Sequence, residues 1–310
     1  MQHLSRYIGF YLLGVLLVSC GLSAEQLRIA TYNVRNYLVM DRYVGASWRP
    51  SYPKPEIEKA AVREVIRAAE PDILVLQEMG TIGFLEELRT DLKREGLYYP
   101  YMVHMVGNDP DRHLAILAKI EPLEVQKHSY IDFNYLDRRE RVKRGILEAT
   151  FAGFDGQPFV VFTLHLKSRY TEDKEDPNSE NRRAREAQAC RDVVLERTIE
   201  RGYRRFMIVG DFNAPPGSAP LRRFYRKGDL EFGTSLLASD TRGEVWTYFY
   251  EKGSNYQAVD GFVLSDSMFN FVKNEAGSIV DIESAPIGSD HRMVYADFVF
   301  EDGAVGAFAE

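Results

Sequence analysis

Short apolar runs and amphipathic stretches alternate along most of this chain. An apolar run bounded by polar or turn residues predicts a buried strand, and apolar residues at helical spacing predict a helix. The predicted strands are residues 27–33, 72–77, 114–119, 145–151, 159–166, 206–210, 245–250, 259–264 and 293–300. The predicted helices are residues 55–69, 82–95 and 180–201. Because strands outnumber helices and several follow each other as hairpins, the pattern favours an α+β fold over a doubly wound parallel sheet.

Two connecting segments carry signals of their own. Residues 36–55 contain Gly, Pro, Trp and Tyr without a regular period, so this stretch is predicted to be a long loop. Its Trp48 and Tyr52 either stack on bases or ring-shaped substrates, or only hold the loop against the surface. Asp155-Gly156 predicts a hairpin turn between two of the strands.

Residues 1–24 resemble an export signal. Arg6 precedes a short apolar stretch that is too short to span a bilayer core of about 30 Å. It ends in Leu17-Val18-Ser19-Cys20, which resembles a bacterial lipoprotein box with Cys20 as the lipidated residue. The alternatives are cleavage after Ala24 and a buried apolar strand. The pattern favours an exported, membrane-anchored lipoprotein on the periplasmic or cell-surface side over a fully secreted protein.

The rest of the chain, residues 25–310, shows no repeat, low-complexity linker or change of composition, so a single domain is expected. Cys20 and Cys190 are the only cysteines, which excludes a four-cysteine zinc site. Cys190 lies in a helical pattern among apolar residues and is expected to be a small core residue.

The net charge of −7 gives no global reason to bind a polyanion. Three segments are nevertheless rich in Arg and Lys, namely residues 138–144, 182–191 and 222–227. Each is either a solvated face or part of a local basic surface.

Polar side chains stand at the ends of the apolar strands. Such a position fixes a side chain at the rim of a sheet, which a catalytic site requires. Taken singly, each residue has a structural explanation, such as a turn or a cap. The residues in question are Asn33, Glu78, His165, Asp211, Asn213, Asp290 and His291.

Together these residues form an oxygen-rich set with two histidines. Carboxylate and amide oxygens suit Mg²⁺, Mn²⁺ or Ca²⁺ better than zinc, and histidine exchanges protons near neutral pH. The chain has no Gly-x-Ser-x-Gly, Walker or His-Glu-x-x-His motif. The set therefore indicates hydrolysis by activated water rather than by a side-chain nucleophile.

Five short blocks in this order resemble the signature of the endonuclease/exonuclease/phosphatase superfamily, which includes deoxyribonucleases, abasic-site endonucleases, sphingomyelinases and inositol-polyphosphate phosphatases. Each block alone is weak, but their order and spacing together are specific. The resemblance implies a four-layer α/β/β/α sandwich with two packed mixed β-sheets and a site at one end. The blocks are Thr31-Tyr32-Asn33-Val34, Leu76-Gln77-Glu78, His165-Leu166-Lys167-Ser168, Gly210-Asp211-Phe212-Asn213 and Ser289-Asp290-His291.

The resemblance also implies a metal site and a phosphate site. Glu78 would ligate the metal, with Asn33 nearby and Asp290 closing the shell. The expected ion is Mg²⁺ or Mn²⁺, with Ca²⁺ as an alternative supporting ion. Arg144 matches a phosphate-binding arginine of the family, and Lys167 is a further candidate, as is Arg185.

For catalysis, the resemblance implies that Asp211 orients or deprotonates the attacking water and that Asn213 holds that water or a phosphate oxygen. His291 would handle a second proton and be oriented by Asp260. His165 would lie near the leaving oxygen, where abasic-site endonucleases have Tyr, which favours the deoxyribonuclease-like or lipase-like branches.

The expected function is a divalent-metal-dependent phosphoesterase that hydrolyses phosphodiester bonds by direct water attack. Nucleic acid is weakly favoured as the substrate because Arg-rich segments are expected near the site. The alternatives are a hydrolase of phospholipid headgroups or small phosphate esters and, in a different class, a catalytically inactive binding module. No protein partner is inferred.

Overall fold

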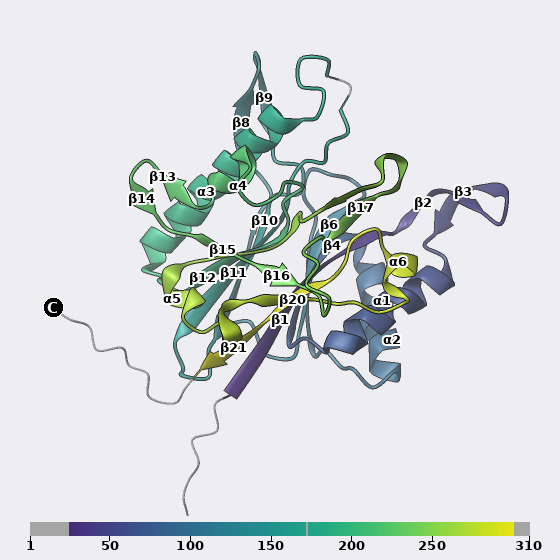
Figure 1. Cartoon of the computed structure of the whole chain (residues 1–310), viewed down its shortest axis with the longest axis horizontal. Helices are drawn as coiled ribbons and strands as arrows, with labels where there is room; N and C mark the ends of the chain where they lie inside the picture. The colour runs from purple at the N-terminus through teal and green to yellow at the C-terminus, as the bar shows by residue number, and fades with distance from the viewer. Residues whose placement is uncertain (1–24, 172, 301–310) are drawn as a thin grey trace, which may run out of the picture.

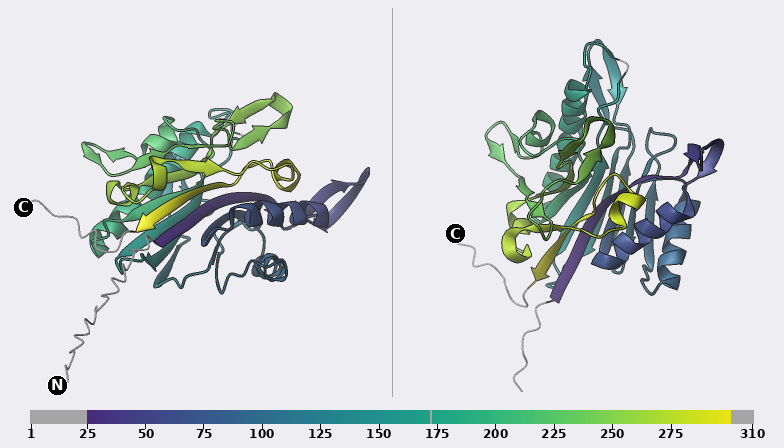
Figure 2. Two further views of the ribbon diagram at one scale, coloured as in Figure 1. Left: turned by 60° about the horizontal axis from the view of Figure 1, so that its bottom comes forward. Right: turned by 45° about the vertical axis from the view of Figure 1, so that its right-hand side comes forward.

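Two β-sheets pack face to face, and helices cover the outer face of each (Figures 1 and 2). The computed structural model describes residues 25–171 and 173–300. In order of hydrogen-bonded neighbours, the seven-stranded sheet contains β16 (Ala238–Ser239), β20 (Gly277–Ile279), β21 (Val294–Phe300), β1 (Glu25–Tyr37), β4 (Ile73–Met79), β6 (His113–Ala118) and β5 (Tyr101–Met105). The six-stranded sheet contains β15 (Thr234–Leu236), β19 (Asp260–Leu264), β12 (Phe206–Asp211), β11 (Pro158–His165), β10 (Ile146–Ala152) and β7 (Glu124–His128).

The remaining elements lie outside the two sheets. The helices are α1 (Glu56–Ala69), α2 (Ile82–Arg94), α3 (Glu180–Arg201), the short α4 (Ala219–Arg222), α5 (Asp266–Phe269) and α6 (Ala285–Gly288), with 3₁₀ turns η1 (Glu251–Gly253) and η2 (Lys273–Glu275). The described part of the chain also contains four two-stranded hairpins: β2 (Val39–Val44) with β3 (Ser47–Pro53), β8 (Asp132–Tyr135) with β9 (Arg138–Arg141), β13 (Arg226–Lys227) with β14 (Leu230–Glu231), and β17 (Tyr248–Tyr250) with β18 (Asn255–Gln257).

The central strands are apolar throughout because both of their faces are buried. Successive side chains of a strand point to opposite faces of its sheet. In β1, Ile29 joins the core between the sheets, and Ala30 joins the core beneath α1 and α2. In β12, Met207 joins the core between the sheets, and Ile208 packs beneath α3 together with Cys190. Each sheet therefore has two buried faces, as continuous apolar runs predict.

Both sheets are mixed. In the seven-stranded sheet β1 is parallel to β4 but antiparallel to β21, and in the six-stranded sheet β12 is parallel to β11 but antiparallel to β19. This architecture confirms the predicted fold class, an α+β four-layer sandwich with two packed mixed sheets. Gly156, with φ +73°, forms the predicted turn between β10 and β11.

The prediction of a long loop at residues 36–55 was wrong. β1 continues to Tyr37, and β2 and β3 form a hairpin that extends away from the body of the molecule (Figures 1 and 2). Its turn residues Gly45 and Ala46 both have positive φ, as tight hairpin turns require. Since β3 is exposed along its whole length, no alternation of buried and exposed positions marks it in the sequence.

Two other predictions concern single segments. The strand expected at residues 245–250 is confined to β17, because the residues before it do not pair in a ladder. Cys190 is a buried free thiol, as expected of a small core residue. Within residues 25–171 and 173–300, none of the helices has the length and apolar character needed to cross a bilayer. The export-signal prediction falls on residues outside this part of the chain.

Candidate active site

The strand registers bring polar ends from both sheets to one end of the sandwich. His165 is the register partner of Asp211, and Asp211 is the register partner of Asp260. Gly210 allows β12 and β11 to approach closely at this point, since a Cβ there would lie 2.0 Å from the Leu164 carbonyl oxygen. Substitution of this glycine would displace the strand that carries Asp211.

Asp211 is the most heavily bonded carboxylate at this end. Its Oδ2 accepts hydrogen bonds from Asn33 Nδ2 at 3.0 Å and from Asn213 Nδ2 at 3.2 Å, and its Oδ1 accepts one from the Asn213 amide at 2.8 Å. The Asn213 side chain also donates to the Leu166 carbonyl at 3.0 Å. Asn213 has φ +50°, a strained conformation for a residue other than glycine, and such strain often marks a functional site.

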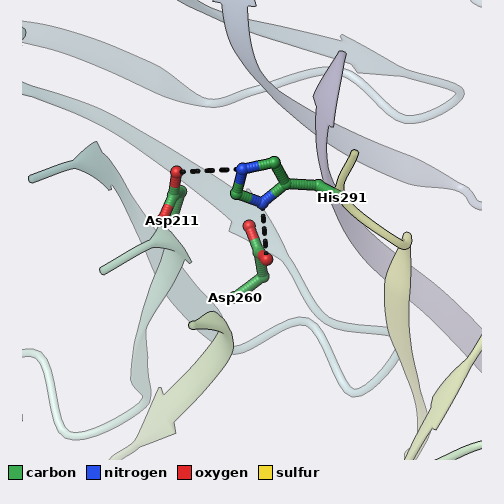
Figure 3. A group of neighbouring side chains, drawn as sticks. All are labelled: Asp211, Asp260 and His291. Atoms are coloured by element: carbon green, nitrogen blue, oxygen red, sulfur yellow. Dashed lines mark hydrogen bonds and ion pairs between the residues drawn. The ribbon is translucent and has the colours of Figure 1, made fainter. Parts of the chain in front are cut away.

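His291 lies between two carboxylates, with one ring nitrogen directed at each (Figure 3). Its Nδ1 is 2.8 Å from Asp260 Oδ2, and its Nε2 is 3.9 Å from Asp211 Oδ2. Asp260 is held in turn by Thr247, whose Oγ1 accepts a hydrogen bond from the Asp260 amide at 3.0 Å. The ring of Tyr248 packs on the imidazole with the ring centres 4.6 Å apart. The orientation of His291 is therefore fixed from two sides.

The electrostatics assign different protonation states to Asp211 and His291. Burial raises the pKa of Asp211 to about 7, the charge of Asp260 adds to the rise, and His291 opposes it. Burial lowers the pKa of His291, but the negative charges of Asp260 and Asp211 outweigh it and raise that pKa to about 10. Near pH 8 the site therefore pairs an ionised carboxylate with a protonated imidazole, a base beside an acid.

The second histidine has a different character. His165 Nε2 lies 3.3 Å from Asp211 Oδ2, and its Nδ1 is buried without a hydrogen-bond partner among the described residues. Burial, together with the positive charge of Arg144, holds the pKa of His165 well below its ordinary value. A neutral His165 can donate a hydrogen bond to Asp211 but is a poor proton donor to a leaving group.

Glu78 opens into a separate pocket of about 570 Å³, here called the Glu78 pocket. Glu78 has φ +60° at an irregularity in the pairing of β4 with β6, and its Oε2 accepts a hydrogen bond from the Asn36 amide at 2.9 Å. The Arg112 guanidinium is 3.9 Å from the same oxygen. The pocket is lined by residues that include Asn36, Glu78, Asp109, Arg112, Arg144 and Lys167.

The predicted phosphate-binding residues share this pocket. Arg144 Nη2 pairs with Asp109 Oδ2 at 3.0 Å, while Arg144 Nε is buried without a hydrogen-bond partner among the described residues. Burial, with the charges of Arg182 and Arg144, lowers the pKa of Lys167 to about 8. The buried Glu186 carboxylate accepts hydrogen bonds from the backbone amides of Lys143 and Lys167, which fixes the backbone at both lysines. Arg144 thus keeps an unused donor for an anion, whereas the Lys167 ammonium adds positive charge but already donates to the carbonyl oxygens of Ser168 and Tyr170.

The Glu78 pocket fits a hard divalent cation. Asn36 Oδ1 is buried and has no hydrogen-bond partner among the described residues, and the same residue donates its amide to Glu78. An unsatisfied buried oxygen beside a carboxylate is a ready ligand for Mg²⁺ or Mn²⁺. Asn33 Oδ1 accepts the Arg35 amide at 3.0 Å and retains a second lone pair. Glu78 and Asn36 are therefore the residues of this pocket that would hold the ion, whereas Asn33 does not line the pocket and contacts Asp211.

Another group has metal-like spacing. The ligand atoms of Asp211, Asp260 and His291 lie within 4.8 Å of one another, and no other trio of His, Cys, Asp or Glu in the described part of the chain does so. Within this trio His291 Nδ1 and Asp260 Oδ2 are 2.8 Å apart, so these two ligand atoms already form a hydrogen bond with each other. We therefore interpret the trio as a proton-handling group.

Asp290 lines a different cavity from Glu78. Its carboxylate is 3.8 Å from Arg35 Nε, and it lines a cavity of about 940 Å³, here called the aromatic cavity. This cavity is also lined by Trp246, Tyr248, Phe249, Tyr250 and Tyr256. Of the predicted metal trio, Asn33 thus contacts Asp211, and Glu78 and Asp290 line different cavities and each face an arginine.

Two candidates from the sequence lie elsewhere. Arg185 lines a cavity on α3 together with Asp132 and Asp192 rather than any of the site residues above. Trp48 and Tyr52 are exposed on the β2–β3 hairpin.

Sequence reasoning missed Thr247, Tyr248, Asn36 and Glu186. Glu186 had a detectable signal, because it is a carboxylate on the apolar face of a predicted helix, next to Ala187. The contacts of the other three depend on the folded chain and leave no local pattern.

Comparison with known proteins gives a consistent result. The model of the Endonuclease/Exonuclease/phosphatase family matches residues 30–291. Comparison with curated sequences finds no match. Sphingomyelinase C from Streptomyces griseocarneus is 16% identical, with a TM-score of 0.60 over 88% of this chain and 99% of that one. The human Nocturnin catalytic domain is 17% identical, with a TM-score of 0.57 over 89% and 95%. An endonuclease/exonuclease/phosphatase from Bacteroides vulgatus is 17% identical, with a TM-score of 0.60 over 90% and 100%.

Proposed function

The chain belongs to the endonuclease/exonuclease/phosphatase family, whose members are metal-dependent hydrolases of phosphoester bonds, and we propose that it is a phosphodiesterase acting on nucleic acid. The observation that carries the proposal is the buried Asp211 carboxylate. Two asparagines donate hydrogen bonds to it, and its Oδ2 lies 3.9 Å from Nε2 of His291. No side-chain nucleophile of the usual kinds is needed, because this pair supplies a base and an acid for water attack.

Each group has a distinct task in the proposed reaction. Asp211 accepts a proton from the attacking water, which Asn213 helps to orient. The water oxygen forms a bond to phosphorus as the ester P–O bond breaks. The electron pair of the broken P–O bond leaves with the departing oxygen, and that oxygen takes a proton from solvent. His291 donates a hydrogen bond to a phosphate oxygen, so that positive charge meets the negative charge that develops there. Asp260 keeps His291 protonated and oriented.

The phosphate charge is balanced from the Glu78 pocket. Arg144 has an unused buried N–H, and Lys167 carries a charge below its pKa of about 8. A divalent ion held by Glu78 and Asn36 would supply further neutralisation and Lewis acidity.

Nucleic acid is the preferred substrate because of the aromatic cavity. Tyr248 belongs to its wall and also packs on His291, so a group next to the scissile phosphate has direct access to it. Two of its rings, Tyr250 and Tyr256, are exposed and suit stacking of a base. Its arginines already pair with acids, Arg35 with Asp290 and both Arg242 and Arg292 with Asp240 and Asp281, so the stacking surface rather than net charge carries this preference.

The second candidate is hydrolysis of a phospholipid headgroup ester. It is supported by the apolar residues Ile282, Ala285 and Pro286 of the same cavity, which suit a hydrocarbon, and by the fold shared with sphingomyelinase C.

A substrate panel tests the proposal. The purified protein is assayed with Mg²⁺ or Mn²⁺, with and without chelator, on single- and double-stranded DNA, RNA, sphingomyelin, inositol phosphates and a chromogenic phosphodiester. We expect chelator-sensitive cleavage of nucleic acid. If only lipid or small esters were hydrolysed, the proposed substrate would be wrong and the proposed mechanism would stand. No turnover of any substrate would favour an inactive binding module.

We also propose that the protein is an exported lipoprotein anchored through Cys20. The support is the Leu17-Val18-Ser19-Cys20 box at the end of a short apolar stretch. Cys20→Ser is expected to shift the protein from the membrane fraction to the soluble fraction of cells. An unchanged membrane fraction would contradict the proposal.

A further inference from the structure

The three basic segments of the chain differ in how much of their charge is neutralised. In residues 138–144, Arg138 pairs with Glu140, Arg139 and Arg141 both pair with Asp132, and Arg144 pairs with Asp109. At the start of residues 182–191, Arg182 pairs with Glu140, and the buried Arg183 donates to the Lys167 carbonyl. These arginines serve the fold or the Glu78 pocket, and none of them forms an extended basic surface.

The segment 222–227 is different because it surrounds a cavity of about 550 Å³. Five cations line this cavity, four from the segment and one from the neighbouring helix α3, and the rest of the lining is Ala219 and Gly228. No acidic residue lines it. The cavity lies where α4 packs on α3 beside the β13–β14 hairpin (Figure 1), and it is here called the basic cleft. Its cations are Arg191, Arg222, Arg223, Arg226 and Lys227.

Only part of this charge is compensated. Asp192 Oδ1 forms ion pairs with Arg191 at 2.8 Å and with Lys227 at 2.9 Å, so one carboxylate is shared by two cations. Arg223 and Arg226 are exposed and form no ion pair with any described residue. The five cations and this one acid sum to +4 on a chain of net charge −7.

Two other acids lie on the β13–β14 hairpin without neutralising the cleft. Glu231 is the register partner of Arg226, but neither it nor Asp229 forms an ion pair in the described part of the chain. The positive charge of the basic cleft therefore remains available to a ligand.

We propose that the basic cleft binds the phosphodiester backbone of a nucleic acid strand, several nucleotides away from the phosphate that is cleaved. Arginine guanidinium groups bind phosphate through paired N–H donors, and a concave arrangement directs several of them at one strand. This inference rests on the proposed nuclease activity and adds a second contact region for the same substrate.

The chain limits how far the cleft lies from the catalytic residues. Ala219, the first residue that lines the cleft, follows Asn213 by six residues, which span at most about 22 Å when fully extended. A duplex strand places one phosphate every 3.4 Å of helix axis, so roughly six or seven nucleotides cover that distance. A strand of about seven nucleotides is therefore long enough to reach from Asn213 to the edge of the cleft at Ala219.

A nucleic acid fits this surface better than an anionic membrane does. A membrane surface is flat and is bound most strongly by basic faces that also insert apolar side chains. The basic cleft is a cavity, and Leu230 is the only large apolar side chain exposed on residues 226–231.

The test uses the full-length protein and a double variant, Arg223→Gln with Arg226→Gln. Both residues are exposed and unpaired in the described chain, so their replacement is not expected to disturb folding. The matched control is Arg139→Gln with Arg141→Gln, which removes two exposed arginines that already pair with Asp132. KM and kcat are measured for a single strand of about 20 nucleotides, for a dinucleotide and for a chromogenic diester.

We expect the double variant to raise KM for the long strand roughly tenfold, with kcat unchanged and with both short substrates unaffected. Its binding to the long strand should also lose about 1.4 from the slope of log affinity against log salt, because two phosphate contacts are removed. The control should behave as wild type.

Three outcomes would overturn the inference and can be distinguished. If wild type cleaves the long strand and the double variant matches the control, the cleft does not bind the strand and the nuclease proposal stands. If wild type hydrolyses the chromogenic diester but neither binds nor cleaves any nucleic acid, both proposals fail. If the double variant loses binding only to phosphatidylglycerol vesicles, the cleft is a membrane contact instead.

Discussion

The two sides of the candidate active site are built differently. On the Asp211 side, Asn33, Asp211, His165 and His291 are all buried, and their polar atoms bond mainly to one another. By contrast, the side chains of Glu78 and Asp290 line two other cavities and are 17% and 31% exposed, and each has an arginine nitrogen 3.8–3.9 Å from its carboxylate.

This difference separates a preorganised region from one that is completed by ligands. The Asp211 side holds its acid and base in place before any substrate arrives, so no reorganisation is needed at the moment of reaction. On the Glu78 side, arginines balance the carboxylates, and a cation and a phosphate can exchange with them. We therefore expect substitutions on the Asp211 side to lower kcat and substitutions on the Glu78 side to change ligand affinity.

The largest effect is expected from the acid and the base themselves. Asp211→Asn and His291→Ala should each lower kcat about 10³-fold, because each removes a group that acts only in the transition state. Steady-state kinetics on the chromogenic diester measure this. The control is His128→Ala, since His128 also pairs with a buried carboxylate, Glu148 at 2.7 Å, and lies on the edge strand β7 without lining the Glu78 pocket. Wild-type rates for both site variants would remove the Asp211 side from the mechanism.

A smaller effect, on metal affinity rather than on kcat, is expected from Glu78. Glu78→Gln should weaken Mg²⁺ or Mn²⁺ binding tenfold or more, in line with the ~10–100-fold losses seen when groups at metal sites are removed. Calorimetric titration of the apoprotein measures the affinity, and excess metal should restore part of the activity. Asp290→Asn sharpens the test. Equal weakening by both variants would place Asp290 in the same metal shell, although the two carboxylates line different cavities here.

The contrast between the two sides also explains what the sequence predicts. Asn33, His165 and Asp211 stand at the ends of apolar strands, and a strand that is buried on both faces has a local pattern that fixes its end. The sequence therefore predicts the fold class and the positions of these residues. The partners that complete the site have no such pattern. The hydrogen bond between Thr247 and Asp260 joins residues thirteen positions apart in the sequence, and that between Ser289 and the Asn33 carbonyl joins residues 256 positions apart.

Exposed elements escape prediction for a related reason. The β2–β3 hairpin pairs with itself and buries little, and it was predicted to be a loop. β3 is exposed throughout, and in β2 the half-buried positions include Arg42 while Val39 and Tyr43 are exposed, so apolar residues do not mark the inner face. The same holds for the basic segments. Their composition is visible in the sequence, but whether an arginine meets Asp132 or remains unpaired depends on folded neighbours.

The pH dependence tests how the Asp211 side is tuned. With Asp211 active as the base and the protonated His291 as the hydrogen-bond donor to the phosphate, kcat should rise as pH increases through about 7 and fall as it approaches about 10. The charge of Asp260 raises both pKa values, so Asp260→Asn should move both limbs of the profile to lower pH. Asp297→Asn is the control. Asp297 forms an ion pair with Arg28 between the neighbouring strands β1 and β21 and forms no ion pair with Asp211, Asp260 or His291. A profile in which neither limb moves would show that Asp260 does not set these protonation states.

The smallest effect is expected on the Glu78 side, from the charge of Lys167. Its pKa of about 8 lies below the ordinary value for lysine, so its ammonium is charged below that pH and neutral above it. A cation that binds phosphate thus disappears as pH rises through about 8, and KM for a phosphodiester should rise several-fold over this interval. The kcat value should stay constant there, since His291 remains protonated up to about 10. Lys167→Arg keeps its charge at every pH in this range and should flatten the rise in KM. If instead kcat follows the titration near pH 8 and KM does not, Lys167 belongs with the acid–base residues, and the two sides of the site are not separate in function.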